Sequence, residues 1–287
     1  MSTKYYKIQS LPNVIKERAV PQPSTLYSSS PSLDQYLSMR RVAIVGSRKP
    51  STYGRAITHK IATELANYGI LIISGLALGI DSIAHTAAVE ANKPTLAVLP
   101  SSITNVYPRS HSNLARNIIE SGGALISEYE ATDQIHKSNF IARNRLIAAL
   151  SEMVIITEAA EKSGSLHTAQ FALEQGIDVM AVPGEITSAL SKGTNNLIKN
   201  GAGVITDTKD ILEALGISEA QKQTRLFHNA LSEDEKIIVT LLERGIKDGG
   251  ELLTKSNLRP EQFQQAITML EINGVITSLG NNTWASK

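Results

Sequence analysis

Short apolar runs alternate with longer stretches of helical periodicity through most of this chain. Seven of the runs have the length of a β-strand and lack polar alternation: VAIV at 42–45, ILIIS at 70–74, TLAVL at 95–99, ALIS at 124–127, MVIIT at 153–157, VMAV at 179–182 and GVIT at 203–206. Such runs are typical of strands that are covered on both faces, as in a parallel sheet flanked by helices. The pattern predicts a doubly wound, mostly parallel α/β domain with an extended Rossmann-like fold.

The segments outside this domain have patterns of their own. The beginning of the chain is rich in serine and proline and is expected to be extended, and a polar linker follows the last strand. The C-terminal segment has three amphipathic helical patterns and a short hairpin pattern, with Pro260 at the start of the third helix. A winged helix is predicted there, with a generic helical tail as the alternative. The predicted organisation is an extended lead-in over 1–40, a Rossmann-like domain over 41–216, a linker over 217–230 and a winged-helix domain over 231–287.

The composition excludes several classes of protein. The 287 residues include no cysteine, which excludes a disulfide framework and a thiolate metal site and fits a reducing cytoplasm. No apolar run approaches the roughly 18 residues that span a bilayer, and the polar N-terminus lacks a signal-peptide core. We therefore expect a soluble, cytoplasmic protein with no membrane partner.

The net charge of +1 does not by itself indicate a nucleic-acid partner, but the charges are unevenly distributed. Three stretches carry lysine or arginine without any acid: 40–63, 134–151 and 187–206. A nearly neutral total therefore hides local basic patches.

The loop GSRKPSTYG leaves the first predicted strand and opens a helix. It lacks the G-x-G-x-x-G fingerprint, and the chain has no G-x-x-x-x-G-K-[ST] motif, which argues against an NAD enzyme and a P-loop protein. Gly46 allows a tight strand exit, Ser47 and backbone N–H groups suit phosphate oxygens, and Arg48 is a bidentate phosphate donor near a helix N-terminus. The alternative is that Arg48 pairs with an acid such as Glu158. We interpret the loop as an anion-binding edge.

A second group of candidate ligands lies in FIARNR at 140–145. Phe140 offers an aromatic face beside basic groups, a combination that holds single-stranded nucleic acid through stacking and phosphate charge. The alternative for Phe140 is a place in the core. Arg143 and Arg145 point to different sides of a helix, so one can face the crevice while the other pairs internally. Weaker candidates are the small donors at further helix starts, Ser163, Gly164 and Asn196.

Catalytic signals are poor. Asp81 is better explained as a helix-capping carboxylate, and His85 as an ordinary contact on a helix face. The chain has no H-E-x-x-H, no G-x-S-x-G and no paired carboxylates, so we expect no catalytic residue, metal site or cofactor. A binding protein fits better than an enzyme.

In their order along the chain, nine motifs resemble the DprA family, also called Smf, the DNA-processing proteins of bacterial natural transformation. They are VAIVGSR, SGLALGIDSIAH, YP at 107–108, ISE at 126–128, NFIARNRLIAALS, VIITEA, SGSLHTA, AVPG and GTNNLIKNGA. The lead-in and the C-terminal module also resemble those of the family. A helical domain that many members carry before the Rossmann domain is not found, and LPSSITNVYP replaces the Gly-rich turn common after the third strand.

The resemblance implies a protein that acts in natural competence and DNA recombination and binds single-stranded DNA without strong sequence preference. Such a protein protects the incoming strand, forms a homodimer and helps to load the recombinase RecA. The family's DNA pocket transfers onto Arg48 and onto Lys137, Phe140, Arg143 and Arg145 of this sequence.

Two other functions remain open. Related Rossmann folds include nucleotide phosphoribohydrolases of the LOG type, and Glu158 with Ser163 and Ser165 is the nearest counterpart of their motif. A winged helix can also read duplex DNA in a sequence-specific manner, but the presumed recognition helix has Glu261 and Glu271 and no lysine or arginine. Contact with a protein is the better interpretation of that module.

Overall fold

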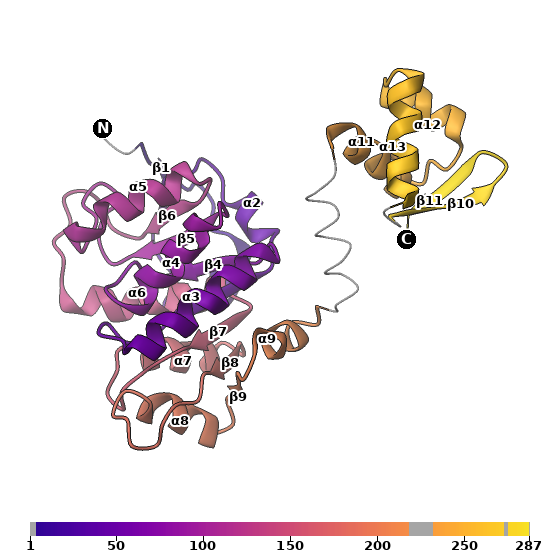
Figure 1. Cartoon of the computed structure of the whole chain (residues 1–287). Helices are drawn as coiled ribbons and strands as arrows, with labels where there is room; N and C mark the ends of the chain where they lie inside the picture. The colour runs from indigo at the N-terminus through magenta and orange to yellow at the C-terminus, as the bar shows by residue number, and fades with distance from the viewer. Residues whose placement is uncertain (1–3, 218–231, 273–274, 287) are drawn as a thin grey trace. The chain divides into compact units, whose positions relative to one another are not determined.

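The computed structural model describes residues 4–217, 232–272 and 275–286. The chain forms two compact units, residues 1–216 and residues 217–287 (Figure 1). The linker predicted over 217–230 lies outside the described residues, apart from Ile217.

One mixed sheet of nine strands organises the first unit, in the order β1-β2-β6-β5-β4-β3-β7-β8-β9. Seven of its strands are parallel: β3 (Arg41–Val45), β4 (Leu71–Ser74), β5 (Thr95–Leu99), β6 (Ala124–Ser127), β7 (Met153–Ile156), β8 (Asp178–Ala181) and β9 (Gly203–Val204). Each coincides with a predicted apolar run to within about two residues. The predicted doubly wound, mostly parallel α/β fold is confirmed.

Helices cover both faces of this sheet (Figure 1). On one face α3 (Thr52–Asn67), α4 (Ile80–Glu90) and α5 (Ser112–Glu120) pack side by side, and on the other α6 (Lys137–Leu150) packs against α7 (Ser165–Glu174). A short 3-10 helix η1 (Arg109–His111) precedes α5, and α8 (Lys192–Lys199) and α9 (Thr208–Ala214) complete the unit. No helix within the described ranges is long and apolar enough to cross a membrane.

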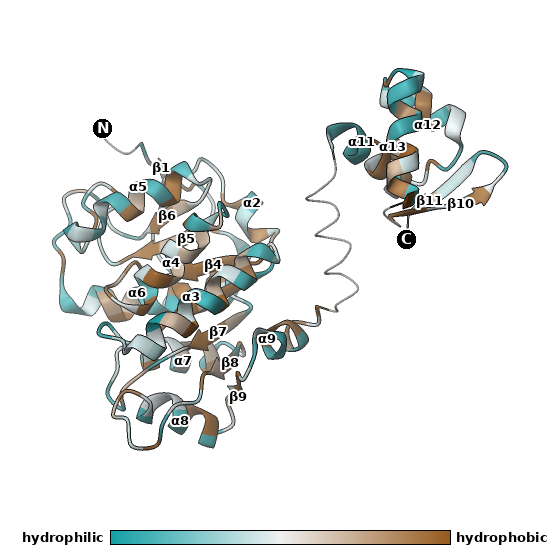
Figure 2. Ribbon diagram, in the orientation of Figure 1, coloured by the Kyte–Doolittle hydropathy of each residue, from teal (hydrophilic) through white to brown (hydrophobic). Residues whose placement is uncertain are grey.

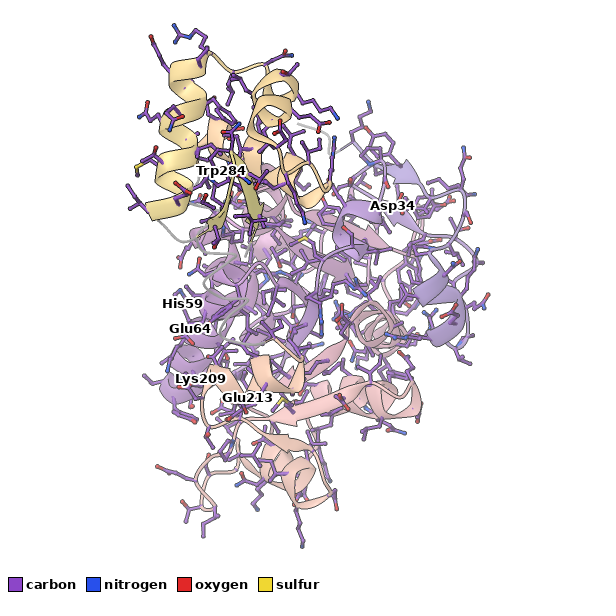
Figure 3. All side chains as sticks on the ribbon, turned by 90° about the vertical axis from the view of Figure 1, so that its right-hand side faces the viewer. Asp34, His59, Glu64, Lys209, Glu213 and Trp284 are labelled. Carbon is purple, nitrogen blue, oxygen red and sulfur yellow. The ribbon has the colours of Figure 1, made fainter. Side chains whose placement is uncertain are left out.

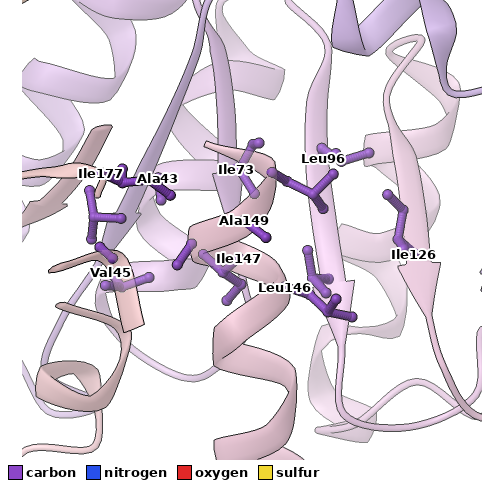
Figure 4. Packing of buried hydrophobic residues seen from close by; sticks show 14 of the residues in the cluster. Ala43, Val45, Ile73, Leu96, Ile126, Leu146, Ile147, Ala149 and Ile177 are labelled. Atoms are coloured by element: carbon purple, nitrogen blue, oxygen red, sulfur yellow. The ribbon is translucent and has the colours of Figure 1, made fainter. Parts of the chain in front are cut away.

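Aliphatic side chains fill the space between the sheet and α6. Figure 2 shows hydrophobic strands at the centre of this unit and hydrophilic residues on the surrounding helices. Residues from four strands meet those of α6 (Figure 4): Ala43, Val45, Ile73, Leu96 and Ile126 pack with Leu146, Ile147 and Ala149. Because these side chains are fully or almost fully buried, α6 is held rigidly against the sheet, and its first turn has a defined position at the sheet's carboxyl edge.

The expected extended lead-in was wrong for the described residues before β3. Strands β1 (Tyr6–Lys7) and β2 (Tyr27–Ser28) add to the sheet, where β2 pairs antiparallel with β6. Helices α1 (Asn13–Arg18) and α2 (Asp34–Leu37) also form, and Ile15, Leu26, Leu33 and Tyr36 belong to the core. These apolar residues occur singly or in pairs, such as Val14-Ile15 and Leu26-Tyr27, and not in a run of strand length or with a clear period, so the sequence pattern did not indicate them.

The second unit has three helices followed by a β-hairpin: α11 (Glu233–Glu243), α12 (Gly249–Ser256), α13 (Pro260–Ile272), β10 (Ile276–Gly280) and β11 (Thr283–Ser286). This is the order predicted for a winged helix. Asn281 and Asn282 form the hairpin turn with φ values of 49° and 59°, left-handed conformations that asparagine tolerates. Trp284, labelled in Figure 3, packs against the unit's own apolar cluster, and its indole N–H donates to Glu271 Oε1 at 2.9 Å.

Candidate functional site

A crevice of about 760 Å³ opens at the carboxyl edge of the parallel sheet. Strand β3 lies between β4 and β7 in the sheet, so the loops after β3 and β7 leave from the point where the strand order reverses. Open α/β sheets bind their ligands at such a switch point. The residues that line the crevice are Val45 to Lys49, Ala77, Asp81, Tyr107, Lys137, Phe140, Ile141, Arg143, Asn144, Ala160, Lys162 to Ser165 and Thr168.

Backbone contacts hold the loop after β3 in place. The Ser47 N–H donates to the carbonyl of Glu158 at 2.7 Å, and the Ile80 N–H donates to the carbonyl of Ser47 at 3.1 Å. Gly79 has a φ of 83°, and a Cβ added there would lie 2.3 Å from the Ser47 carbonyl oxygen. The loops after β3 and β4 can approach this closely only because residue 79 is glycine.

The carboxylate of Glu158 occupies the N-terminus of α3. It accepts hydrogen bonds from the Ser51 N–H, at 2.8 Å, and from the Ser51 hydroxyl, while Ser51 Oγ accepts from the Gly54 N–H at 3.0 Å. A negative group is stabilised there by the unpaired N–H groups and the helix dipole. The pairing of Arg48 with Glu158 that we considered is therefore not formed, and this helix end already has an anion of the chain's own.

Arg48 is exposed and lies against an aromatic side chain. Its Cζ is 5.2 Å from the centroid of the Phe140 ring, a cation–π distance. Phe140 in turn meets Tyr107 edge to face, with ring centroids 5.5 Å apart and an interplanar angle of 81°. Phe140 is half-buried and Tyr107 is 44% exposed. Phe140 therefore lies at the surface of the crevice and not in the core, which was the alternative. Arg48, Phe140 and Tyr107 form the rim of the crevice.

Beneath this rim, Arg143 and Asp81 form a buried charged floor. Arg143 Nη1 donates to the carbonyls of Gly75 and Val98, each at 2.5 Å, and Asp81 Oδ2 accepts from the Gly75 N–H at 3.1 Å. Burial raises the pKa of the Asp81 carboxyl and the charge of Arg143 opposes that shift, while burial lowers the pKa of Arg143 to about 10. Asp81 thus has the expected structural role, but it bonds the backbone of the loop after β4 and does not cap α4 as we had predicted. Arg143 is held by backbone carbonyls at Nη1 and by Asn144 Oδ1 at Nε.

Two predicted ligands do not belong to the crevice. Arg145 Nη2 pairs with Glu128 Oε1 at 2.5 Å, and both side chains are buried, at 6% and 13% exposure. Arg145 is thus the internally paired arginine of the two. Asn196 is exposed on α8 but does not line the crevice, whereas its neighbour Asn195 bonds both backbone groups of Gly184.

The remaining candidates come together as predicted. Besides Arg48 and Phe140, the crevice includes Gly46, Ser47, Lys137, Ser163 and Gly164. Lys137 is the first residue of α6 and is exposed, and Ser163 Oγ lies 2.8 Å from Ser165 Oγ in the loop after β7.

Residue patterns did not identify Tyr107 and Lys162 as ligands, although both line the crevice, and Lys49 was included only as part of its loop. Each lies within or next to a motif that was noticed, so the signal was present, but isolated lysines and a tyrosine before proline do not identify a ligand. With Arg48 and Lys137, the lysines bring four exposed cations to the crevice, and none of the four forms an ion pair within the described residues. Asp81 is the one carboxylate among the described residues that line it.

His85 lies in the interior and does not line the crevice. His85 is fully buried, its Nδ1 lies 2.8 Å from Thr95 Oγ1, and burial lowers its pKa to about 3. In the described parts of the chain, no cluster of three or more His, Cys, Asp or Glu residues could hold a metal ion.

Known proteins are similar to this chain in sequence and in fold. Residues 5–216 match the family described as DNA recombination-mediator protein A. The chain is 45% identical to protein Smf of Escherichia coli K12 over 175 residues, which are 61% of this chain and 47% of that protein. It is 40% identical to DNA processing protein DprA of Bacillus subtilis 168 over 176 residues, 61% of this chain and 59% of that protein. The chain thus spans about half to three fifths of the length of these two relatives.

The fold is also similar to a solved structure of DNA processing protein A from Helicobacter pylori, which concerns that protein's single-stranded DNA binding mode. The TM-score is 0.67 at 33% identity, and the match covers 74% of this chain and 95% of the other.

Proposed function

The chain belongs to the DNA recombination-mediator protein A family, and from this premise we propose that it binds single-stranded DNA in the crevice without strong sequence preference. The single observation that carries the proposal is the surface shared by Arg48, Phe140 and Tyr107, where a cation and two aromatic rings face one opening. Bases of any sequence stack on aromatic faces, and cations beside them bind the phosphates.

Charge in the crevice supports this choice of ligand. Four exposed cations without ion-pair partners in the described residues surround one buried carboxylate, whose charge Arg143 balances. Phosphates would neutralise these cations and release counterions, so affinity should fall steeply as salt rises. Serine hydroxyls and backbone N–H groups of the loops after β3 and β7 add neutral donors for phosphate oxygens.

Membership of the family supports a role in DNA recombination in the cell. We propose that the protein protects incoming single strands during natural transformation, acts as a homodimer and helps to load RecA. The similarity to recombination mediators and to the Helicobacter pylori protein supports this role. It is a binding function, with no catalytic step assigned to any residue.

A phosphoribohydrolase of the LOG type is the less favoured alternative. Such an enzyme needs a carboxylate that can reach a nucleotide, and Glu158 was the candidate. Its two oxygens bond Ser51 at the start of α3, it is 3% exposed, and it does not line the crevice. Release of a free base from a nucleoside monophosphate would revive this function.

Fluorescence anisotropy with labelled oligo-dT, a duplex and a mononucleotide tests the proposal at several salt concentrations. We expect salt-sensitive binding of oligo-dT, weaker binding of the duplex and a loss of about tenfold or more in Arg48→Ala, since hydrogen bonds to charged groups are worth about 1.5–3 kcal/mol. Arg55→Ala is the matched control, because Arg55 is an exposed arginine of α3 that does not line the crevice. Equal affinities of the two variants for oligo-dT would refute the site.

A further inference from the structure

The crevice is too small for more than a short piece of a strand. Its volume of about 760 Å³ lies within the range of roughly 300–1,000 Å³ in which a pocket encloses one small ligand. A longer strand must therefore leave over the rim, and the rim residue Tyr107 leads directly into η1 and α5.

This side of the rim is anchored to the crevice at two points. The Tyr107 ring packs on Phe140, and His111 Nδ1 lies 2.9 Å from the carbonyl oxygen of Leu76, in the loop after β4. A DNA strand that leaves the Phe140–Tyr107 surface in this direction next meets Arg109, which follows Tyr107 by two residues in the sequence.

The burial pattern gives η1 and α5 an outer face. His111 and Leu114 are half-buried, and Ala115 and Ile118 are buried, so these residues form the inner face. Arg109, Asn113, Arg116 and Glu120 are exposed and recur on the opposite face with helical spacing. Two arginines and an amide thus follow one another outward from Tyr107 before the first acid.

Charge on this face is unbalanced. Residues 91–119 contain no aspartate or glutamate, and neither Arg109 nor Arg116 forms an ion pair within the described parts of the chain. Glu120 ends the same face one turn after Arg116 but forms no ion pair with it. Exposed arginines that are not engaged in ion pairs are suitable partners for backbone phosphates.

We propose that Arg109 and Arg116 form a second phosphate-binding segment, which holds a DNA strand after it leaves the crevice over Tyr107. This inference rests on the proposed function. It extends the site from a pocket to a path along the outer face of α5 and makes affinity depend on strand length.

The test compares oligo-dT of about 3 and about 20 nucleotides, because a crevice the size of one small ligand holds only a few nucleotides. For Arg109→Gln/Arg116→Gln, the longer oligonucleotide should bind about tenfold more weakly, and its salt slope should fall by about 1.4, since each phosphate contact contributes about 0.7 for single strands. The shorter oligonucleotide, which the crevice alone can hold, should bind within about twofold of wild type.

The matched control is Lys93→Gln/Lys199→Gln. It removes the same charge from the opposite edge of the sheet, because Lys93 precedes β5 and Lys199 ends α8 before β9, and it should leave both affinities unchanged. Equal losses for both lengths, an equal loss in the control, or no loss for the longer strand would overturn the second segment. Failure of the wild-type protein to bind either oligonucleotide would instead refute the proposed function, and this inference with it.

Discussion

The guanidinium of Arg48, in the loop after β3, lies over the ring of Phe140 in the first turns of α6, with Cζ 5.2 Å from the ring centroid. The two residues come from different elements that line the crevice and are distant in the chain. Their contact places a fixed positive charge beside an aromatic surface, and Tyr107 extends that surface. A base on this aromatic surface and a phosphate on the guanidinium would thus lie next to each other.

Phe140→Leu tests the stacking surface. The leucine preserves apolar bulk but has no aromatic face, so affinity for oligo-dT should fall by about 1–3 kcal/mol, the range for stacking one base. Anisotropy titrations measure the change, and thermal unfolding should stay close to wild type. Phe171→Leu is the control, since Phe171 packs against the core from α7 and does not line the crevice. An unchanged affinity of Phe140→Leu would exclude stacking on this ring.

Gly79→Ala should disrupt the loop that carries Arg48. The φ of 83° is unfavourable for alanine, and the new Cβ would lie 2.3 Å from the Ser47 carbonyl oxygen and 2.7 Å from the Arg48 carbonyl carbon. We expect a loss of about 1–3 kcal/mol in the free energy of unfolding and weaker DNA binding by the protein that remains folded. Gly164→Ala, where an added Cβ meets no atom within 4 Å, should unfold like wild type. Similar stabilities of the two variants would contradict this account.

Arg145→Met should act on stability and not on DNA. It leaves the Glu128 carboxylate buried without its partner, which costs about 3–5 kcal/mol in comparable pairs. Denaturant unfolding measures the loss, and Glu128→Gln/Arg145→Met should recover part of it. The folded protein at low temperature should bind oligo-dT with wild-type affinity. Weaker binding at unchanged stability would return Arg145 to the list of DNA ligands.

His85 should make the protein sensitive to acid. Its pKa falls from 6.5 to about 3, with burial as the largest cause and the charge of Arg143 contributing. Below about pH 6.5 the unfolded chain binds a proton at this residue that the folded protein does not, so stability falls as pH falls, by up to about 1.4 kcal/mol per pH unit. Urea unfolding between about pH 7 and 5 gives the free energy of unfolding at each pH. In His85→Gln this free energy should change less steeply with pH, by the equivalent of about one proton. An identical slope in the variant would argue that His85 is protonated in the folded protein.

Strands and loops were predictable because their signals are local. Each parallel strand is buried on both faces and must be apolar throughout, so VAIV and TLAVL could be recognised without any partner in view. Loops after parallel strands converge on one edge by topology, and this brought Ser47, Lys137 and Ser163 together as expected. The lead-in escaped prediction because buried residues that occur singly or in pairs, such as Ile15 and Leu26, carry no period.

Side-chain partners were not predictable. Two arginines separated by one residue on α6 cannot be told apart by their sequence context, yet Arg143 lines the crevice and bonds the carbonyls of Gly75 and Val98, while Arg145 pairs with Glu128. Glu158 likewise could have met Arg48, but the start of α3 lies closer and takes both its oxygens.

By itself, the amino-acid sequence determined the α/β class and the edge of the sheet at which most of the candidate site residues come together, because backbone period and strand direction govern these properties. The tertiary structure alone decided which cations remain free for a ligand. A buried charge requires a partner, and which partner lies within hydrogen-bonding distance depends on how distant segments pack. That packing leaves Arg48 exposed beside Phe140, whereas it buries Arg145 in an ion pair with Glu128.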